Sequence, residues 1–197
     1  MTTSGILRAA FSGIALAAVG ATANAAPMTY EIDSNHTFPA FEADHLGGIS
    51  ILRGKINSTA GTIVLDKEAG TGSVDIAMQM ASIDFGHDGL SDHARSPDMF
   101  DVEQFPTATY TGELVDFEDG SPTAVDGTLT MHGESQPVTL TINSFVCRQH
   151  PQQGREVCGA DATAMINRAD FGVDFAQNFG FLMDVTLRIS IEALVAE

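Results

Sequence analysis

Strict alternation of apolar and polar residues near the end of the chain is the sequence feature that most restricts its fold. From residue 185 to residue 193 every second residue is apolar, and the residues between them are Thr, Arg, Ser and Glu. Successive side chains of a β-strand point to opposite faces, so this pattern predicts a strand with one buried and one wet face. Residues 74–80 and 138–143 follow the same period. Such strands bury their apolar faces when two sheets pack together or when one sheet closes into a barrel.

Further short strands and turn signals extend this pattern over most of the chain. Clusters rich in Gly, Asp and Pro separate the strand candidates, which lie at residues 30–33, 38–45, 51–57, 61–66, 107–117, 124–132 and 157–166. Residues 88–104 lack the alternation and contain a Ser-Pro step, which indicates one or two short helices. With neither a linker nor an internal repeat, the sequence predicts a single all-β domain, either a barrel or a sandwich.

A short apolar segment at the start of the chain predicts a targeting sequence. Arg8 is the only charged side chain before Glu31, and it is followed by the apolar residues 9–19 and by Ala-Asn-Ala at 23–25. A positive start, a short apolar core and a small-residue cleavage site are the layout of a secretory signal peptide. A transmembrane anchor is the alternative, but the core is short for a bilayer of about 30 Å. We therefore predict a signal peptide at 1–25 and a mature domain at 26–197, located in the periplasm if the organism has an outer membrane.

Two cysteines, Cys147 and Cys158, flank a polar segment that contains Pro151 and Gly154. Such a segment between two strand candidates predicts a hairpin loop. A cysteine pair at the base of a hairpin in an exported protein predicts a disulfide. A redox-active pair is the alternative, but the wide spacing lacks the C-x-x-C turn that lowers a thiol pKa.

The acidity of the chain limits its partners. Nine Lys and Arg stand against 26 Asp and Glu, for a formal net charge of −17. Binding to nucleic acid requires clustered basic side chains that neutralise phosphates, so we expect no nucleic-acid partner. The same charge disfavours electrostatic docking on an anionic leaflet, and we expect no stable membrane insertion.

In a barrel with a wet exterior, the apolar parity of each strand has to point inward. This parity assigns one face of three strands to the lumen, and four aromatic residues are candidate walls. The predicted lumen residues are Val74, Ile76, Met78, Met80, Val138, Leu140, Ile142, Val185, Leu187, Ile189, Ile191, Phe38, Phe41, Tyr110 and Phe181. Methionines and the small residues of 160–164 leave room for a ligand, although tight packing explains them equally well.

Several motifs follow one another across nearly the whole mature chain. They are Tyr30–Thr37, Phe41–Gly47, Ser82–Asp84, Ser91–Ser96, Met99–Tyr110, Gly127–Gly133, Gln136–Leu140 and Ile166–Gly172. In this order they resemble the YceI-like family of exported, lipocalin-like, polyisoprenoid-binding proteins. The resemblance implies an eight-stranded antiparallel lipocalin-like barrel with a short helical insertion around residues 88–104. It also implies an elongated apolar pocket for an isoprenoid or a similar long chain.

The residue pattern contains little evidence for a catalytic site or a metal site. The six histidines lack the tight paired spacing of zinc ligands, and no G-x-S-x-G elbow is present. We therefore predict a protein that is not an enzyme, with no catalytic residues, no metal site and no cofactor other than a bound lipid.

Arg168, in a motif that ends at Gly172, allows two interpretations. In the first, Arg168 reaches the barrel mouth and contacts a ligand head group. In the second, Arg168 pairs with Asp170 to close the barrel end, with Phe171 as a plug. The second interpretation is favoured.

We conclude from the sequence that the chain is an exported carrier or sequestering protein for a long-chain isoprenoid, such as a quinone or a polyprenyl lipid. The alternative is a stress or partner-binding β protein without a small-molecule ligand. The oligomeric state stays open, with a homodimer as one alternative.

Overall fold

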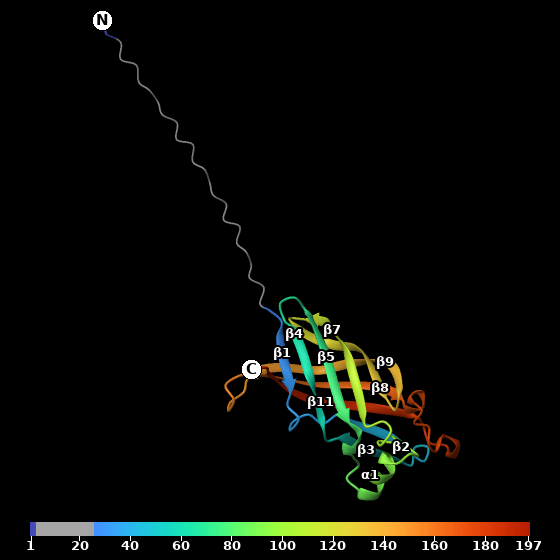
Figure 1. Ribbon diagram of the computed structural model, residues 1–197. Coiled ribbons are helices and arrows are strands. Elements are labelled where there is room, and N and C mark those ends of the chain that lie inside the picture. Colours follow the sequence, from blue (N-terminus) through green and yellow to red (C-terminus); the bar gives the residue numbers. More distant parts are fainter. Residues whose placement is uncertain (3–25) are drawn as a thin grey trace.

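The first strand hydrogen-bonds to other strands on both of its sides, and this double pairing closes a barrel. A computed structural model describes residues 1–2 and 26–197, so the predicted signal peptide lies almost wholly outside the described residues. Within residues 26–197, β1 pairs with β4 on one side and with β11 on the other, which joins the ends of an eight-stranded antiparallel ladder (Figure 1). The strands of the ring are β1 (Met28–Ile32), β4 (Thr59–Asp66), β5 (Thr71–Gln79), β7 (Thr107–Glu118), β8 (Ser121–Met131), β9 (Glu134–Gln149), β10 (Glu156–Asn167) and β11 (Asp184–Val195).

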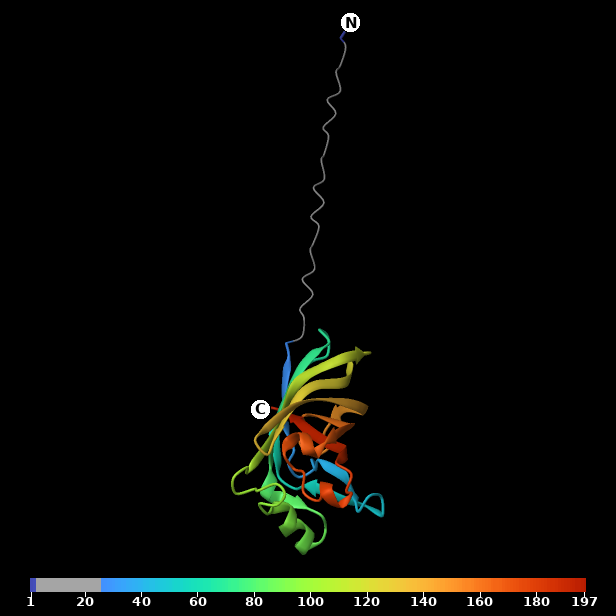
Figure 2. The same ribbon diagram turned by 90° about the vertical axis from the view of Figure 1, so that its right-hand side faces the viewer.

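A three-stranded extension widens one end of this barrel. It consists of β2 (Ala40–His45), β3 (Ser50–Ile56) and β6 (Ile83–Asp84). The last residues of β11 pair with β1, whereas its residues 185–188 pair with β2. The barrel therefore flares where β11 leaves β1 for β2, and the short helix α1 (Asp88–Arg95) lies at this flared end (Figures 1 and 2).

The strand pattern read from the sequence is confirmed, with differences in detail. Each predicted strand coincides with an observed one, but β9 runs far beyond residues 138–143. Met80 begins the 3-10 turn η1 (Met80–Ser82), because its carbonyl accepts from the amide of Ile83 three residues later. Within residues 88–104 only α1 is an α-helix. It ends before Pro97, whose ring disfavours helical backbone at the preceding residue. β6 (Ile83–Asp84) was not predicted, because a strand of two residues is too short to show the alternation of apolar and polar residues.

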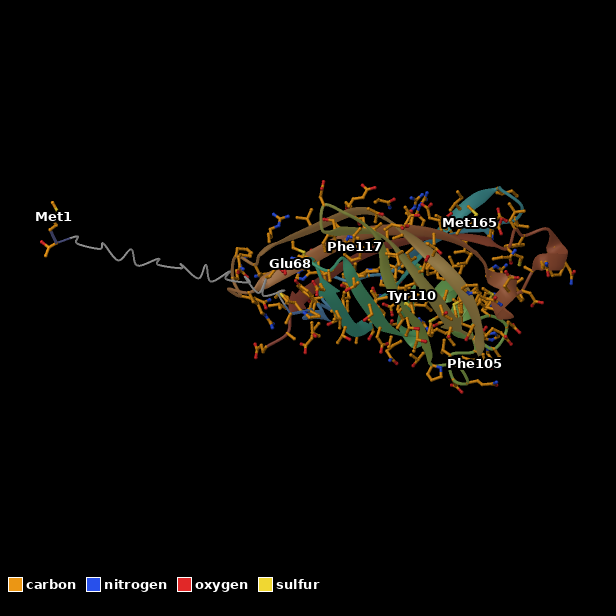
Figure 3. All side chains as sticks on the ribbon, turned by 90° about the horizontal axis from the view of Figure 1, so that it is seen from above. Met1, Glu68, Phe105, Tyr110, Phe117 and Met165 are labelled. Carbon is orange, nitrogen blue, oxygen red and sulfur yellow. A yellow bond between two sulfur atoms is a disulfide. The ribbon has the colours of Figure 1, made fainter. Side chains whose placement is uncertain are left out.

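A pair of facing glycines lets an aromatic residue lie against the inner wall. Gly112 of β7 pairs with Gly127 of β8. A Cβ atom at Gly127 would lie 2.5 Å from the hydroxyl oxygen of Tyr110, so only glycine leaves room for this ring. Tyr110, labelled in Figure 3, is buried, and its hydroxyl donates to the carbonyl of Val138 at 2.8 Å. Burial raises the pKa of Tyr110 to about 12, so its hydroxyl stays a neutral donor.

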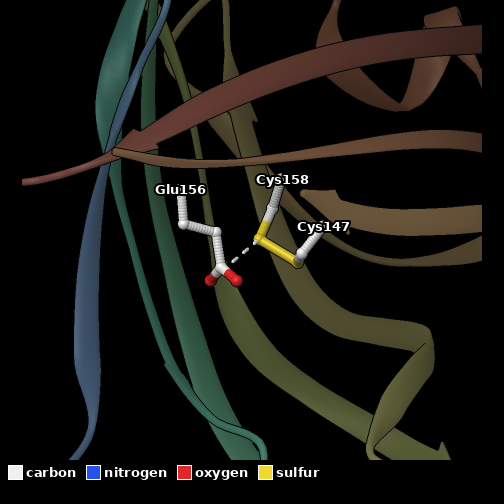
Figure 4. A group of neighbouring side chains, drawn as sticks. All are labelled: Cys147, Glu156 and Cys158. Atoms are coloured by element: carbon white, nitrogen blue, oxygen red, sulfur yellow. Dashed lines mark hydrogen bonds between the residues drawn. A yellow bond between two sulfur atoms is a disulfide. The ribbon is translucent and has the colours of Figure 1, made fainter. Parts of the chain in front are cut away.

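The predicted disulfide joins β9 and β10 at the end of the barrel opposite the flare. Cys147 and Cys158 face each other in the register of the two strands, with Cα atoms 4.0 Å apart and an S–S bond of 2.03 Å (Figure 4). The predicted hairpin loop follows directly, between the end of β9 and the start of β10. Among the described residues, no helix is long and apolar enough to cross a membrane.

Breaking the Cys147–Cys158 bond should lower the free energy of unfolding by about 3 kcal/mol, because the cross-link restricts the unfolded chain. Urea unfolding with and without reductant measures this loss. The double variant Cys147→Ala/Cys158→Ala is the control, and its unfolding midpoint should not respond to reductant. Equal stability of the oxidised and reduced proteins would contradict the prediction.

Candidate functional site

An apolar cavity of about 400 Å³ occupies the lumen of the barrel. This volume lies in the range typical of small-molecule sites. Its lining begins near Tyr30, Leu65 and Leu114 and reaches Leu90, beside α1, at the flared end. Every strand of the ring contributes side chains to it.

The inward parity predicted from the sequence agrees with the placement of these side chains. The predicted residues that line the cavity are Phe41, Val74, Ile76, Met78, Met80, Tyr110, Val138, Leu140, Ile142, Phe181, Val185, Leu187, Ile189 and Ile191. Their contact with a ligand remains a prediction.

Phe38 is the exception, and its assignment to the lumen is corrected. Its neighbours Thr37 and Pro39 are buried and line the cavity, as does Phe41. Because side chains alternate along an extended segment, Phe38 falls on the opposite face. There the ammonium group of Lys55 lies 4.7 Å from the centre of its ring.

Other residues that line the lumen lie on predicted strands but were not among the predicted lumen residues. Ile63 of β4, Leu114 of β7, and Val125 and Leu129 of β8 line the cavity. The same two-residue period that marked β5 and β11 would have found them. Phe85 and Phe100, which flank α1, follow no such period; Phe85 lines the cavity and packs edge-on against Phe41, with ring centres 5.4 Å apart.

The cavity opens between α1 and the segment that follows β10. Leu90, His93 and Phe175 line the cavity and are also exposed to solvent, so they mark the opening. The rings of His93 and Phe175 meet edge to face at 4.9 Å, and those of His45 and Phe181 do so at 5.3 Å. We call this opening the mouth.

Arg168 lies beside the mouth and holds the segment that forms one of its edges. It is 9% exposed and lines the cavity. Its guanidinium donates from Nη1 to the carbonyl of Val173 at 2.6 Å and from Nη2 to the carbonyl of Phe175 at 2.8 Å. Burial lowers the pKa of this guanidinium, while Asp174 and Asp44 oppose the shift.

The predicted pairing of Arg168 with Asp170 is wrong. Both residues belong to the 3-10 turn η2 (Arg168–Phe171), but Asp170 is exposed whereas Arg168 is buried. Among the described residues, no ion pair includes Arg168, so backbone carbonyls replace the expected carboxylate. Phe171 is 1% exposed and packs in the core, as a plug would.

Asp44 ties two loops together at the flared end. Its carboxylate accepts from the amides of Gly47 and Gly48 in the turn after β2, and from the amide of Leu182 before β11. The bond from Leu182 is the main reason that the pKa of Asp44 lies below its ordinary value.

A polar cluster lies at the closed end, near the disulfide. The buried Tyr30 hydroxyl donates to Glu156 Oε1 at 2.5 Å, and Lys67 Nζ donates to the same oxygen at 2.9 Å. Burial and the adjacent carboxylate raise the pKa of Tyr30 well above its ordinary value. Burial opposes ionisation of Glu156, but the bonds from Tyr30 and Lys67 hold its pKa below the ordinary value. At neutral pH Glu156 is therefore ionised and Tyr30 is neutral, and the cluster joins β1, β10 and the turn after β4.

In the part of the chain that the structure describes, two groups of His, Cys, Asp and Glu have donor atoms within 4.8 Å of one another, and both have other structural roles. Cys147 and Cys158, which lie beside Glu156, form the disulfide and offer no free thiolate (Figure 4). In the group of Asp33, His36 and Glu192, Asp33 accepts from His36 Nδ1 at 2.7 Å and closes a turn. His87 caps the start of α1, and Asp92 pairs with Arg95.

Thr59 carries an unsatisfied polar atom in the lining. Among the described residues, its hydroxyl is the one buried side-chain oxygen or nitrogen without a hydrogen-bond partner. By contrast, the equally buried hydroxyl of Thr37 donates to the carbonyl of Glu192 and accepts from its amide. The lumen thus offers one free hydroxyl in an otherwise apolar region.

Comparisons with known proteins agree with this architecture. The model of the YceI-like domain family matches residues 30–193. A UPF0312 protein of Vibrio vulnificus is 30% identical over 164 residues, which cover 82% of this chain and 86% of that protein. The solved structure of Campylobacter jejuni YceI protein aligns with a TM-score of 0.64 at 24% identity, covering 76% of this chain and 88% of the other. A polyisoprenoid binding domain from Saccharophagus degradans aligns with a TM-score of 0.60 at 16% identity, covering 86% and 99%.

Acid should release the Asp44 contacts. Since the pKa of its carboxyl is lowered, these contacts stabilise the folded protein above the ordinary value of 3.8 and are lost as the pH falls through the folded value. Amide chemical shifts of Gly47 and Leu182, followed by NMR from about pH 5 to pH 2, should report this step. In Asp44→Asn the same amides should show no such titration, and an identical curve would rule out the assignment.

Thr59→Val should stabilise the protein by about 1 kcal/mol, because it removes a buried hydroxyl without a partner and keeps the side-chain shape. Thr37→Val is the matched control and should destabilise it by about 1–2 kcal/mol, because two hydrogen bonds are lost. Urea unfolding of both variants measures the difference. A stabilised Thr37→Val or a destabilised Thr59→Val would contradict the two assignments.

Proposed function

The chain belongs to the YceI-like family, and on that premise we propose that it is an exported carrier or sequestering protein for a long-chain isoprenoid. A quinone or a polyprenyl lipid is the expected occupant of the barrel lumen. Binding consists of hydrophobic enclosure, with a small number of polar contacts at the mouth. The proposed function requires no chemical step and no cofactor beyond the bound lipid.

The observation that carries this proposal is the apolar lining of the lumen. The cavity extends along the barrel, and its walls are mostly aliphatic and aromatic side chains. Each buried methylene of a ligand contributes about 0.8 kcal/mol before the costs of ordering and association are subtracted. A long hydrocarbon therefore gains more from this lining than a compact polar ligand does.

Two further observations support the proposal. The Saccharophagus degradans protein with the same fold is named a polyisoprenoid binding domain. The disulfide is typical of proteins that work in an oxidising compartment, which agrees with export and with a periplasmic location.

Arg168 is the proposed contact for the ligand head group. A guanidinium carries five N–H donors, and the contacts to Val173 and Phe175 occupy one from each terminal nitrogen. Donors beside the mouth suit a phosphate or a quinone carbonyl. The acyl or prenyl chain then extends away from Arg168 into the lumen.

Ile189→Trp should weaken lipid binding, because the larger side chain occupies part of the lumen. Displacement of an apolar fluorophore by a prenyl quinone measures the affinity, and we expect a loss of about tenfold or more. Met165→Trp is the matched control on β10, since Met165 is 69% exposed and outside the cavity lining. Equal affinity of Ile189→Trp and the wild type would count against the lumen as the binding site.

Native mass spectrometry of the protein purified gently from cells tests the ligand class. A stoichiometric isoprenoid in the organic extract would support the proposal and identify the ligand. An empty protein that also fails to take up added quinone would overturn it, and would favour the alternative of a partner-binding barrel without a small ligand.

A further inference from the structure

Large apolar side chains are exposed on two loops at the flared end of the barrel. Leu46 and Ile49 lie in the turn between β2 and β3, and Ile51 follows at the start of β3. Phe179 and Leu182 lie in the segment between η2 and β11. Ile49 and Phe179 are the most exposed of them, at 76% and 77%. We call these five residues the apolar tip.

The two loops of the apolar tip are held together. The Asp44 carboxylate accepts amide hydrogen bonds from both loops. Gly47 approaches the carbonyl of Gly180 so closely that a Cβ atom at Gly47 would lie 3.0 Å from it. The β2–β3 turn and the 3-10 turn η3 (Gln177–Phe179) also lie side by side at this end in both views of the ribbon (Figures 1 and 2). The five exposed side chains therefore belong to one apolar surface patch and not to two separate patches.

The two loops that carry the apolar tip also border the cavity. Phe181 lines the cavity, while its neighbour Leu182 is exposed. Leu52 lines the cavity, while its neighbour Ile51 is exposed. The tip therefore lies at the same end of the barrel as the mouth, on loops that contribute to the wall of the lumen.

Both loops lack charged side chains. Residues 46–52 and 175–183 contain no Lys, Arg, Asp or Glu, although the chain as a whole has a formal net charge of −17. Entry of the tip into an apolar environment therefore requires little desolvation of charge.

We propose that the apolar tip inserts into the surface of a lipid bilayer and places the mouth against the hydrocarbon region. This inference rests on the proposed function, since it supplies the route by which a water-insoluble isoprenoid enters the lumen. The protein is held at the bilayer only by these few side chains, and the acidic body favours release.

A second copy of the chain fits the apolar tip less well than a bilayer does. Each side of a stable protein–protein interface contributes about 800 Å² and 20–30 residues. Five side chains on two protruding turns fall well short of this number. A fluid bilayer surface, by contrast, adapts to a small convex apolar protrusion.

The test compares two double variants of the mature protein. Ile49→Ser/Phe179→Ser removes the two most exposed side chains of the tip. Val146→Ser/Met165→Ser is the matched control, since Val146 and Met165 are 55% and 69% exposed on the barrel strands β9 and β10. Binding to phosphatidylcholine vesicles is measured by co-sedimentation. Transfer of a prenyl quinone from these vesicles is measured by stopped flow.

The tip variant should bind the vesicles about 100-fold more weakly, at about tenfold per large apolar side chain, and should take up quinone correspondingly more slowly. The control variant should match the wild type. Vesicles that contain anionic phosphatidylglycerol should bind the wild type less well at low salt, because the body of the protein is acidic. Equal vesicle binding by the tip variant and the wild type would overturn the inference.

Farnesol, a short prenyl alcohol presented free in solution, separates this inference from the proposed function. Wild type and tip variant should bind farnesol equally, because the lumen is unchanged. If the wild type does not bind farnesol, the proposed function fails. If both bind it and the tip variant also takes up vesicle quinone at the wild-type rate, only the bilayer contact fails. A dimer that the tip variant dissociates, without wild-type binding to vesicles, would show that the tip joins two copies instead.

Discussion

The division of β11 between two partners is the constraint on which the rest of the structure depends. Its last residues pair with β1 and close the ring, while its first residues pair with β2 and widen it. Buried backbone N–H and C=O groups require partners, so the ladder itself decides where the barrel closes and where it opens. The flare therefore belongs to the sheet and does not depend on a mobile loop. The cavity, its mouth and the surfaces around the mouth follow from this arrangement.

Polar groups at the two ends are satisfied in ways that leave the lumen apolar. At the closed end, Tyr30 and Lys67 both donate to Glu156, and the disulfide lies beside them. At the open end, Arg168 donates to carbonyls of the segment that it supports, and Asp44 accepts from backbone amides. A buried polar group without a partner destabilises the folded protein. Because these charged groups find their partners at the two ends of the barrel, they need no polar side chains in the lumen. Under the proposed function, the hydrocarbon chain of the ligand occupies the space between them.

The sequence predicts the walls of this site better than its ends, for a physical reason. A strand of a barrel repeats every two residues, so Val74, Ile76 and Ile189 reveal their side of the sheet wherever they lie in the chain. The mouth depends on contacts between segments far apart in sequence, such as Asp44 with Leu182, and no local period encodes them. Phe38 shows that the residue type alone does not assign a side chain to the lumen. Phe38 was predicted to point inward because it is aromatic, but it lies three residues from Phe41 and therefore on the opposite face of the extended segment. The pairing of Arg168 with Asp170 failed similarly, because opposite charges two residues apart need not share a face of a 3-10 turn.

The carbonyl partners of Arg168 bear on how a ligand would be oriented under the proposed function. Carbonyl oxygens satisfy N–H donors without cancelling the positive charge, and no carboxylate among the described residues forms an ion pair with this guanidinium. Asp44 and Asp174 act on it only through longer-range attraction. A positive centre therefore remains beside the mouth of an acidic protein, in partly desolvated surroundings where electrostatic interactions are strong. An anionic or carbonyl head group gains most at that position, whereas Leu65, Ile63 and Leu129 deeper in the lumen offer apolar contacts. The two ends of an amphipathic lipid thus prefer opposite ends of the cavity, with the head at the mouth and the chain toward Tyr30.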